Sequence, residues 1–252
     1  MSSTIRTQPI KRSDSAPKFS IVVPARDEER WIGACLEAIR RAAAPYPGLV
    51  ETIVVLNRCS DRTAEIALAH GARTIEAAGK NLAVIRNAGA RAATGDILIT
   101  VDADSVMSPR TLSEAERHLA SGRYIGGGTM IQPERMSLGI AATGVIIAYL
   151  ILRYRVSAGL FWLERSTFEA LGGFDESLVS VEDVDLAIRL KAFGLARGKR
   201  FGTLWKAPIT TSCRKFDHFG DWYLLKNLKL ARDLLGGRDE RAANLFFYDF
   251  PR

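Results

Sequence analysis

Short apolar runs alternate with helix-like segments through the first half of the chain, and this alternation constrains the fold more than any other feature. Each run with strand character is followed by a segment in which apolar residues recur at helical spacing. Such an order is typical of a mostly parallel sheet with helices on both faces. The expected strands are 19–24, 51–57, 72–76 and 96–102, and the expected helices are 27–44, 60–70, 80–93 and 109–121. The predicted fold class is α/β, with ligands at the carboxyl ends of the strands.

The composition is sufficient for a full hydrophobic core without disulfide bonds or structural metal ions. Of the 252 residues, 47% are hydrophobic and 25% are charged, as in ordinary globular proteins. Folding of such a chain buries roughly 73% of its surface. Cys35, Cys59 and Cys213 include no CxxC pair, which argues against a zinc ribbon or a disulfide framework and favours a reducing, cytoplasmic compartment.

The charge balance is basic, because 35 Lys and Arg residues outnumber 28 Asp and Glu residues and give a net charge of +7. This surplus fits an anionic partner such as a membrane surface or a phosphorylated substrate, and it equally fits a solvated basic surface. The basic residues are scattered rather than arranged in a stripe with aromatic residues, so nucleic acid is not expected as a partner.

Two segments bear on targeting and on membranes. Residues 1–17 are polar without an apolar run, so we expect a flexible tail rather than a signal peptide. Residues 138–152 are uncharged and apolar, but a helix of this length, about 22 Å, is shorter than the ~30 Å hydrocarbon core. One interpretation is a buried core helix. The other is a helix at a membrane interface over 138–155, with Arg153 and Arg155 just beyond the apolar run.

The loop after the fourth expected strand carries two carboxylates. Side chains two residues apart on an extended segment point to the same side, so Asp102 and Asp104 would face one space at the sheet edge. Two carboxylates there repel each other unless a cation lies between them. A magnesium or manganese ion that bridges these carboxylates to a diphosphate is one hypothesis, and turn-forming aspartates are the other.

A second acidic cluster, Glu182-Asp183-Val184-Asp185, follows Ser180. Ser180 and Asp183 could form a capping box at a helix start. Alternatively, one of the carboxylates projects into the cleft as a base. A cap would explain Asp183 but not Glu182, and the residues leave both interpretations open.

These motifs, taken together, resemble glycosyltransferase family 2. The order is VVPARDEE, NRCSDRTAEIA, GKNLAVIRNAGARAATGDILITVDADS and GGFDESLVSVEDVDLAIRL, over roughly residues 19–215. The resemblance implies a GT-A fold with a Rossmann-like half. It implies a nucleotide-binding half at 18–105, an acceptor half at 106–220 and a C-terminal helical segment at 221–252, all within a single domain at 18–252.

The resemblance also assigns roles. It implies that Asp183 is the catalytic base, that Asp104 binds a divalent cation, and that His218 is a further metal ligand. It places Trp162, Glu182 and Gly173 around the sugar and acceptor, and Arg214 and Lys215 near the diphosphate. Trp162 would either stack on a sugar ring or form part of the core. Asn57 stands where the family often has an aspartate that contacts the base. The nucleotide would be bound by Pro24, Ala25, Arg26, Glu28, Asn57, Lys80, Arg86, Asp102 and Ala103.

The implied activity is transfer of one sugar, with inversion, from a nucleotide-diphosphate sugar to an acceptor hydroxyl, assisted by Mg²⁺ or Mn²⁺. The acceptor is open and includes lipid-linked molecules, with contact at the inner face of the membrane. One alternative is a nucleotidyltransferase of similar fold, which the PARDEE loop disfavours because that class normally has a glycine-rich loop there. Another is a non-catalytic module that binds a nucleotide sugar.

Overall fold

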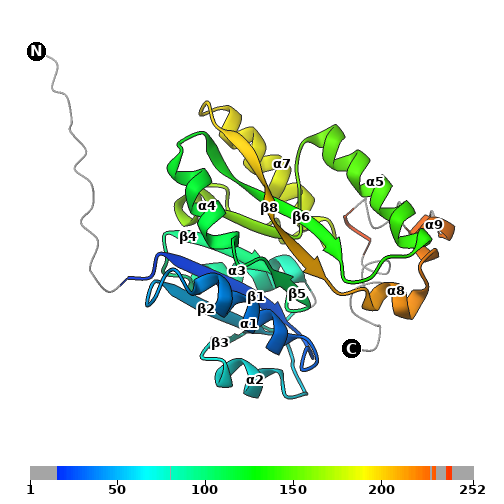
Figure 1. The fold of residues 1–252 in the computed structure, drawn as a ribbon, viewed down its shortest axis with the longest axis horizontal. Coiled ribbons are helices and arrows are strands. Elements are labelled where there is room, and N and C mark those ends of the chain that lie inside the picture. The colour runs from blue at the N-terminus through cyan, green and yellow to red at the C-terminus, as the bar shows by residue number, and fades with distance from the viewer. Residues whose placement is uncertain (1–15, 80, 228, 231–236, 240–252) are drawn as a thin grey trace, which may run out of the picture.

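The computed structural model describes residues 16–79, 81–227, 229–230 and 237–239, and within them a single twisted sheet organises the chain (Figure 1). Its strand order is β3-β2-β1-β4-β7-β6-β8-β5. The predicted strands of the first half form one side of this sheet, and the second half of the chain supplies most of the other side. Lys80, which we expected to bind the nucleotide, lies outside the described residues.

The first side of the sheet is fully parallel. β1 lies between β2 and β4, and β2 also pairs with β3. The apolar runs form these strands because alternate side chains enter the core on opposite faces. The strands are β1 (Phe19–Ala25), β2 (Val50–Leu56), β3 (Arg73–Glu76) and β4 (Ile97–Val101). Their carboxyl ends therefore meet at one edge, as predicted.

The second half adds a mixed set of strands. β7 is antiparallel to β4 and β6, whereas β6 and β8 are parallel. Glycine is required where β6 meets β8, because a Cβ on Gly127 would lie 1.8 Å from the carbonyl oxygen of Gly202. These strands are β5 (Ser105–Met107), β6 (Tyr124–Pro133), β7 (Leu160–Glu164) and β8 (Arg200–Thr211).

Helices cover both faces of the sheet, which confirms the expected architecture. One core cluster joins β1, β4 and β7 to α1, α2 and α4, and a second cluster on the other face joins the same strands to α3, α6 and α7. The helices are α1 (Ile32–Ala43), α2 (Thr63–Ala69), α3 (Leu82–Ala92), α4 (Thr111–Ala120), α6 (Arg165–Ala170) and α7 (Glu182–Leu195).

Two helices begin later than the sequence predicts, because their preceding loops bind each other. α1 begins at Ile32 rather than at residue 27, and α2 begins at Thr63 rather than at Ser60. The Ser60 backbone N–H and hydroxyl both donate to Asp27, so Ser60 is not the expected cap. Asp61 accepts from the Thr63 backbone N–H instead, at 2.9 Å.

The apolar run forms α5 (Leu138–Tyr154), and the buried-core interpretation of this helix is wrong. Ile140 and Thr143 are buried, but Val145 is 70% exposed and Leu152 is 73% exposed. α8 (Arg214–Phe219) and α9 (Tyr223–Lys226) follow β8, and the remainder of the expected helix at 221–235 lies largely outside the described residues. Among the described residues, none of the helices has the length and apolar character needed to span a membrane.

Candidate functional site

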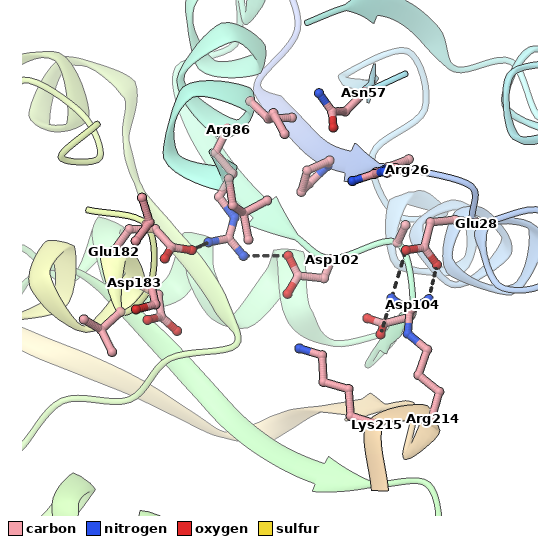
Figure 2. Close-up of a pocket in the computed structure, with 18 residues that line it drawn as sticks. Arg26, Glu28, Asn57, Arg86, Asp102, Asp104, Glu182, Asp183, Arg214 and Lys215 are labelled. Atoms are coloured by element: carbon pink, nitrogen blue, oxygen red, sulfur yellow. Dashed lines mark hydrogen bonds and ion pairs between the residues drawn. The ribbon is translucent and has the colours of Figure 1, made fainter. Parts of the chain in front are cut away.

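A cavity of about 200 Å³ opens at the sheet edge where β1, β2 and β4 end. The first two loops contribute Arg26, Glu28 and Asn57 to its wall, and the loop after β4 contributes Asp102 and Asp104 (Figure 2). The opposite wall comes from the second half of the chain, at the starts of α7 and α8. The cavity therefore joins segments that are more than a hundred residues apart. Its predicted members are Pro24, Ala25, Arg26, Glu28, Asn57, Arg86, Asp102, Ala103, Asp104, Glu182, Asp183, Arg214 and Lys215.

Arg86 connects the two walls. Its guanidinium reaches Asp102 Oδ1 and Glu182 Oε1, each at 2.6 Å (Figure 2). The Arg86 and Glu182 side chains are each only 8% exposed. Burial works to lower the pKa of Arg86, but the charges of Asp102, Glu182 and Asp183 outweigh it and raise that pKa. A permanently charged guanidinium thus fixes the edge of β4 to the start of α7.

Arg214 forms a second bridge on the other side of the cavity. Its guanidinium contacts Glu28 through two hydrogen bonds of 2.6 and 2.9 Å, and it lies 3.0 Å from Asp104 Oδ2. Ser212 also donates to Asp104, at 3.0 Å. Two planar hydrogen bonds to one carboxylate hold an arginine in a defined orientation. Arg214 consequently presents positive charge beside the residue expected to bind a cation.

The structure separates the roles of Glu182 and Asp183. Glu182 is buried and bound to Arg86, whereas no ion pair with Asp183 is found among the described residues. Asp183 Oδ1 accepts from the Val184 backbone N–H at 2.7 Å. Burial raises the pKa of Asp183, against the opposing charge of Arg86, and this favours acceptance of a proton.

The capping-box interpretation of this segment is wrong. α7 begins at Glu182, with Val181 rather than Ser180 at the N-cap position, so Asp183 is not at the third helical position. Val181 has φ +56°, a left-handed conformation that is unfavourable for a β-branched residue. Backbone strain of this kind clusters at functional sites. It turns the chain into α7 beside the cavity and brings both acidic residues to its wall.

Asn57 is buried beneath the cavity, and its amide group is already oriented. Its Nδ2 donates to the carbonyl oxygens of Ala77 and Gly79, at 2.7 and 2.8 Å. Because both amide hydrogens are used, only the carbonyl oxygen Oδ1 can meet a ligand, and it already accepts a long hydrogen bond of 3.5 Å from Arg58. Asn57 therefore offers an acceptor, as an aspartate would.

Asp102 and Asp104 fit a metal ion that is coordinated mainly by a bound phosphate ligand and water rather than entirely by protein side chains. No group of three or more His, Cys, Asp or Glu side chains within the described part of the chain is arranged to hold an ion. Asp104 lines the cavity, and Mg²⁺ sites commonly use one or two carboxylates together with phosphate oxygens and water. Asp102 pairs with Arg86 and Asp104 pairs with Arg214, each through one carboxylate oxygen, so the second oxygen of each carboxylate lies outside its ion pair.

Three expected site residues lie elsewhere. Trp162 is fully buried in the core and donates to the Gly128 carbonyl oxygen at 2.9 Å, so the core interpretation is confirmed and the sugar-stacking interpretation is wrong. Gly173 lines a separate groove, where a Cβ would lie 2.6 Å from Asn87 Oδ1, and it does not reach the cavity. His218 is exposed on α8 outside the cavity lining, contrary to its expected role as a metal ligand.

Apolar lining residues were missed by the motif-based reasoning. Leu82 and Ile85 lie on the face of α3 that carries Arg86, and Val179 and Val181 precede the acidic cluster. Helical spacing could have identified the first pair, because residues three and four apart share a face. No sequence pattern marks the second pair, which reaches the cavity through an irregular loop.

The sequence matches the family model described as Glycosyl transferase family 2 over residues 20–143. This segment, about half of the chain, belongs to glycosyltransferase family 2. It is 33% identical over 110 residues to the low-salt glycan biosynthesis hexosyltransferase Agl6 of Haloferax volcanii. That match covers 44% of this chain and 26% of the relative, so this family 2 chain spans about a quarter of the curated relative.

Solved structures with the same fold are glycosyltransferases of low sequence identity. TarS of S. aureus has a TM-score of 0.61 at 16% identity, covering 89% of this chain and 41% of that chain. The mannosyltransferase PcManGT of Pyrobaculum calidifontis, in complex with GDP-Man and Mn²⁺, has a TM-score of 0.60 at 19% identity, covering 94% and 82%. Glucosyl-3-phosphoglycerate synthase of Mycobacterium tuberculosis, with Mn²⁺, UDP and phosphoglyceric acid, has a TM-score of 0.57 at 19% identity, covering 89% and 80%. The family 2 chain has the predicted GT-A fold.

Removal of the Arg86 charge should destabilise this family 2 fold. We expect Arg86→Met to lower the free energy of unfolding by about 3–5 kcal/mol at neutral pH, because buried Glu182 loses its partner. Burial already raises the pKa of Glu182, and loss of Arg86 raises it further. The penalty is therefore present above that pKa and decreases as the pH falls through it. Urea unfolding at about pH 8 and about pH 5 measures both effects.

Arg91→Met is the matched control. Arg91 lies on the same helix, but its side chain is exposed and its ion pair with Glu176 is long, at 3.6 Å. Exposed pairs contribute little to stability, so this variant should unfold like the wild type. Equal losses in the two variants would show that the buried bridge does not stabilise the fold.

Proposed function

We propose that this chain transfers one sugar from a nucleotide-diphosphate sugar to an acceptor hydroxyl, with inversion at the anomeric carbon. The observation that carries this proposal is the arrangement of the cavity, in which Asp183, without an ion pair among the described residues, shares one cavity with the Asp102–Asp104 loop. Family membership supports sugar transfer, and several structural neighbours are complexes with UDP-GlcNAc, GDP-Man or UDP-Glc.

The reaction is a single displacement. The Asp183 carboxylate accepts the proton of the acceptor hydroxyl while that oxygen forms a bond to the anomeric carbon. The bond between this carbon and the diphosphate oxygen breaks, and the diphosphate leaves with the electron pair on the opposite face. Attack from the face opposite the leaving group inverts the configuration. Glu182 is unsuited to accept the proton because Arg86 holds its carboxylate.

The leaving diphosphate gains negative charge, and the cavity supplies positive groups on that side. Arg214 and Lys215 line the cavity next to Asp104. Fixed cations that face a developing charge lower the barrier because they need no rearrangement during the reaction. A divalent cation bound at Asp104 would add charge neutralisation on the diphosphate, as Lewis acids do in phosphate chemistry.

Asp183→Asn should remove the base and retain donor binding. We expect turnover to fall by roughly 10²–10⁴-fold, the usual contribution of a general base, with little change in the affinity for the nucleoside diphosphate. A donor panel screened by thermal shift identifies the nucleotide sugar, and single-turnover kinetics with that donor measures the loss. Asp185→Asn is the control, because Asp185 lies two residues further along α7 and pairs with Arg189 at 2.6 Å. Unchanged turnover in the Asp183 variant would exclude Asp183 as the base.

Nucleoside diphosphate binding should depend on a divalent cation. We expect chelation of Mg²⁺ or Mn²⁺ to weaken binding at least about tenfold, because Asp104 would then share no cation with the phosphates. Calorimetric titration with and without chelator measures the difference, and Asp104→Asn should abolish it. Equal affinity under both conditions in the wild type would remove the cation from the proposal.

Asn57 should select bases that carry a ring N–H. Its Oδ1 can accept from uracil N3–H or guanine N1–H, whereas cytosine and adenine present an unprotonated nitrogen at the equivalent edge. We expect UDP or GDP to bind at least about tenfold more tightly than CDP and ADP, because Oδ1 would face the lone pair of a ring nitrogen in cytosine and adenine. Calorimetry with the four nucleotides measures this preference, which Asn57→Leu should reduce. Equal binding of all four to the wild type would contradict this role.

A further inference from the structure

Helix α5 exposes apolar side chains on every side of its central turn, over residues 145–149. Residues 144–149 are all exposed, although they span more than one full helical turn. Leu138 is 83% exposed, and Val145 and Leu152 are 70% and 73% exposed. In Figure 1, α5 lies at the rim of the molecule, beyond the end of β6 and beside α8 and α9. An apolar helix in this position is unfavourable in water, and a surface of this kind marks an interaction site.

The charged residues within α5 and at its C-terminal end are all basic. Residues 136–155 contain no Asp or Glu. Arg153 and Arg155 are exposed at the C-terminal end of the helix, and neither is ion-paired with an acidic side chain among the described residues. Arg135 at the other end is different, because it binds Asp217 and Asp221. The positive charges of Arg153 and Arg155 therefore favour binding to a surface that is anionic and lies next to an apolar phase.

Aromatic residues with polar edges accompany the apolar side chains. Tyr149, Tyr154 and Trp222 are all substantially exposed. A Cβ on Gly139 would lie 2.7 Å from the Asp221 carbonyl oxygen, which places the start of α5 against the segment that carries Trp222. Tyr and Trp are typical of the boundary between membrane and water, where an apolar ring and a polar edge are both satisfied.

We propose that α5 docks this chain on an anionic lipid bilayer by entering the boundary between headgroups and acyl chains. Its 17 residues give a helix of about 25 Å, which is shorter than the ~30 Å hydrocarbon core. Arg153 and Arg155 would meet the lipid phosphates. A second copy of the chain would cover only one stripe of the helix, whereas acyl chains can surround the exposed residues 144–149.

The segment that leads into α5 is hydrogen-bonded to the segment that carries Arg214, at the edge of the cavity described above. Glu134 accepts from the Cys213 backbone N–H at 2.8 Å, and Arg214, the next residue, lines the cavity. The Arg135 pairs with Asp217 and Asp221 fix the same junction. A bilayer bound to α5 would thus lie close to the opening, where an amphiphilic acceptor could reach the donor. The docking itself does not depend on the proposed sugar transfer.

Vesicle flotation of the full chain tests the docking. We expect the chain to float with vesicles of equal phosphatidylglycerol and phosphatidylcholine, and less with phosphatidylcholine alone. Val145→Asp combined with Leu152→Asp should reduce the partition coefficient at least about tenfold, because both apolar side chains are replaced by charges. Arg153→Glu combined with Arg155→Glu should remove most of the preference for anionic lipid.

The matched control is Leu68→Asp combined with Leu195→Asp, since these leucines are 60% and 61% exposed on α2 and α7. This control should float like the wild type, and UDP binding by all variants tests the cavity separately. Three results would overturn the docking: no flotation of the wild type, equal flotation of the α5 variant, or self-association in sedimentation that the α5 variant abolishes without any lipid binding.

Discussion

The buried Arg86 bridge is the interaction on which the rest of the cavity depends. Arg86 comes from α3, Asp102 follows β4, and Glu182 begins α7, so a single guanidinium connects both halves of the chain. An arginine suits this position because its planar group binds two carboxylates and stays charged when buried. Without it, Asp102, Glu182 and Asp183 would face one another at a low-dielectric edge. The bridge allows an acidic cavity wall to exist before any ligand binds.

The same principle governs the other side of the cavity. Arg214 pairs with Glu28 and lies beside Asp104, so the acidic side chains on both sides of the cavity are paired with arginines of the protein. The Cys35 thiol is buried in the core behind these carboxylates. Burial is the main cause that raises its pKa, and the negative charges of Asp104 and Asp102 raise it further. Such a thiol stays protonated and acts as a small apolar side chain. Pre-arranged cations suit a dianionic leaving group, because orientation is established before the charge develops.

Much of the parallel half could be predicted from the sequence because its signals are local. Apolar runs identified β1 to β4, and the ends of parallel strands must meet, which brought Asn57 and Asp102 to one edge. Long-range packing decided the remainder. Trp162 looks like a sugar-stacking residue only until the glycines of β6 allow that strand close enough to bind its indole N–H and bury it. The run at 138–152 has the composition of a core helix, and composition does not encode whether another surface covers it.

The start of α7 shows how two adjacent acidic residues acquire different chemistry. Both lie in the first helical turn, where the helix dipole favours negative charge, and burial raises the pKa of both. The geometry of Arg86 distinguishes them, because its guanidinium hydrogen-bonds Glu182 and acts on Asp183 only through space. Glu182 is thereby fixed as a structural anion. Asp183 keeps an oxygen available at the cavity wall, with a pKa raised toward the range in which a carboxylate accepts protons most effectively.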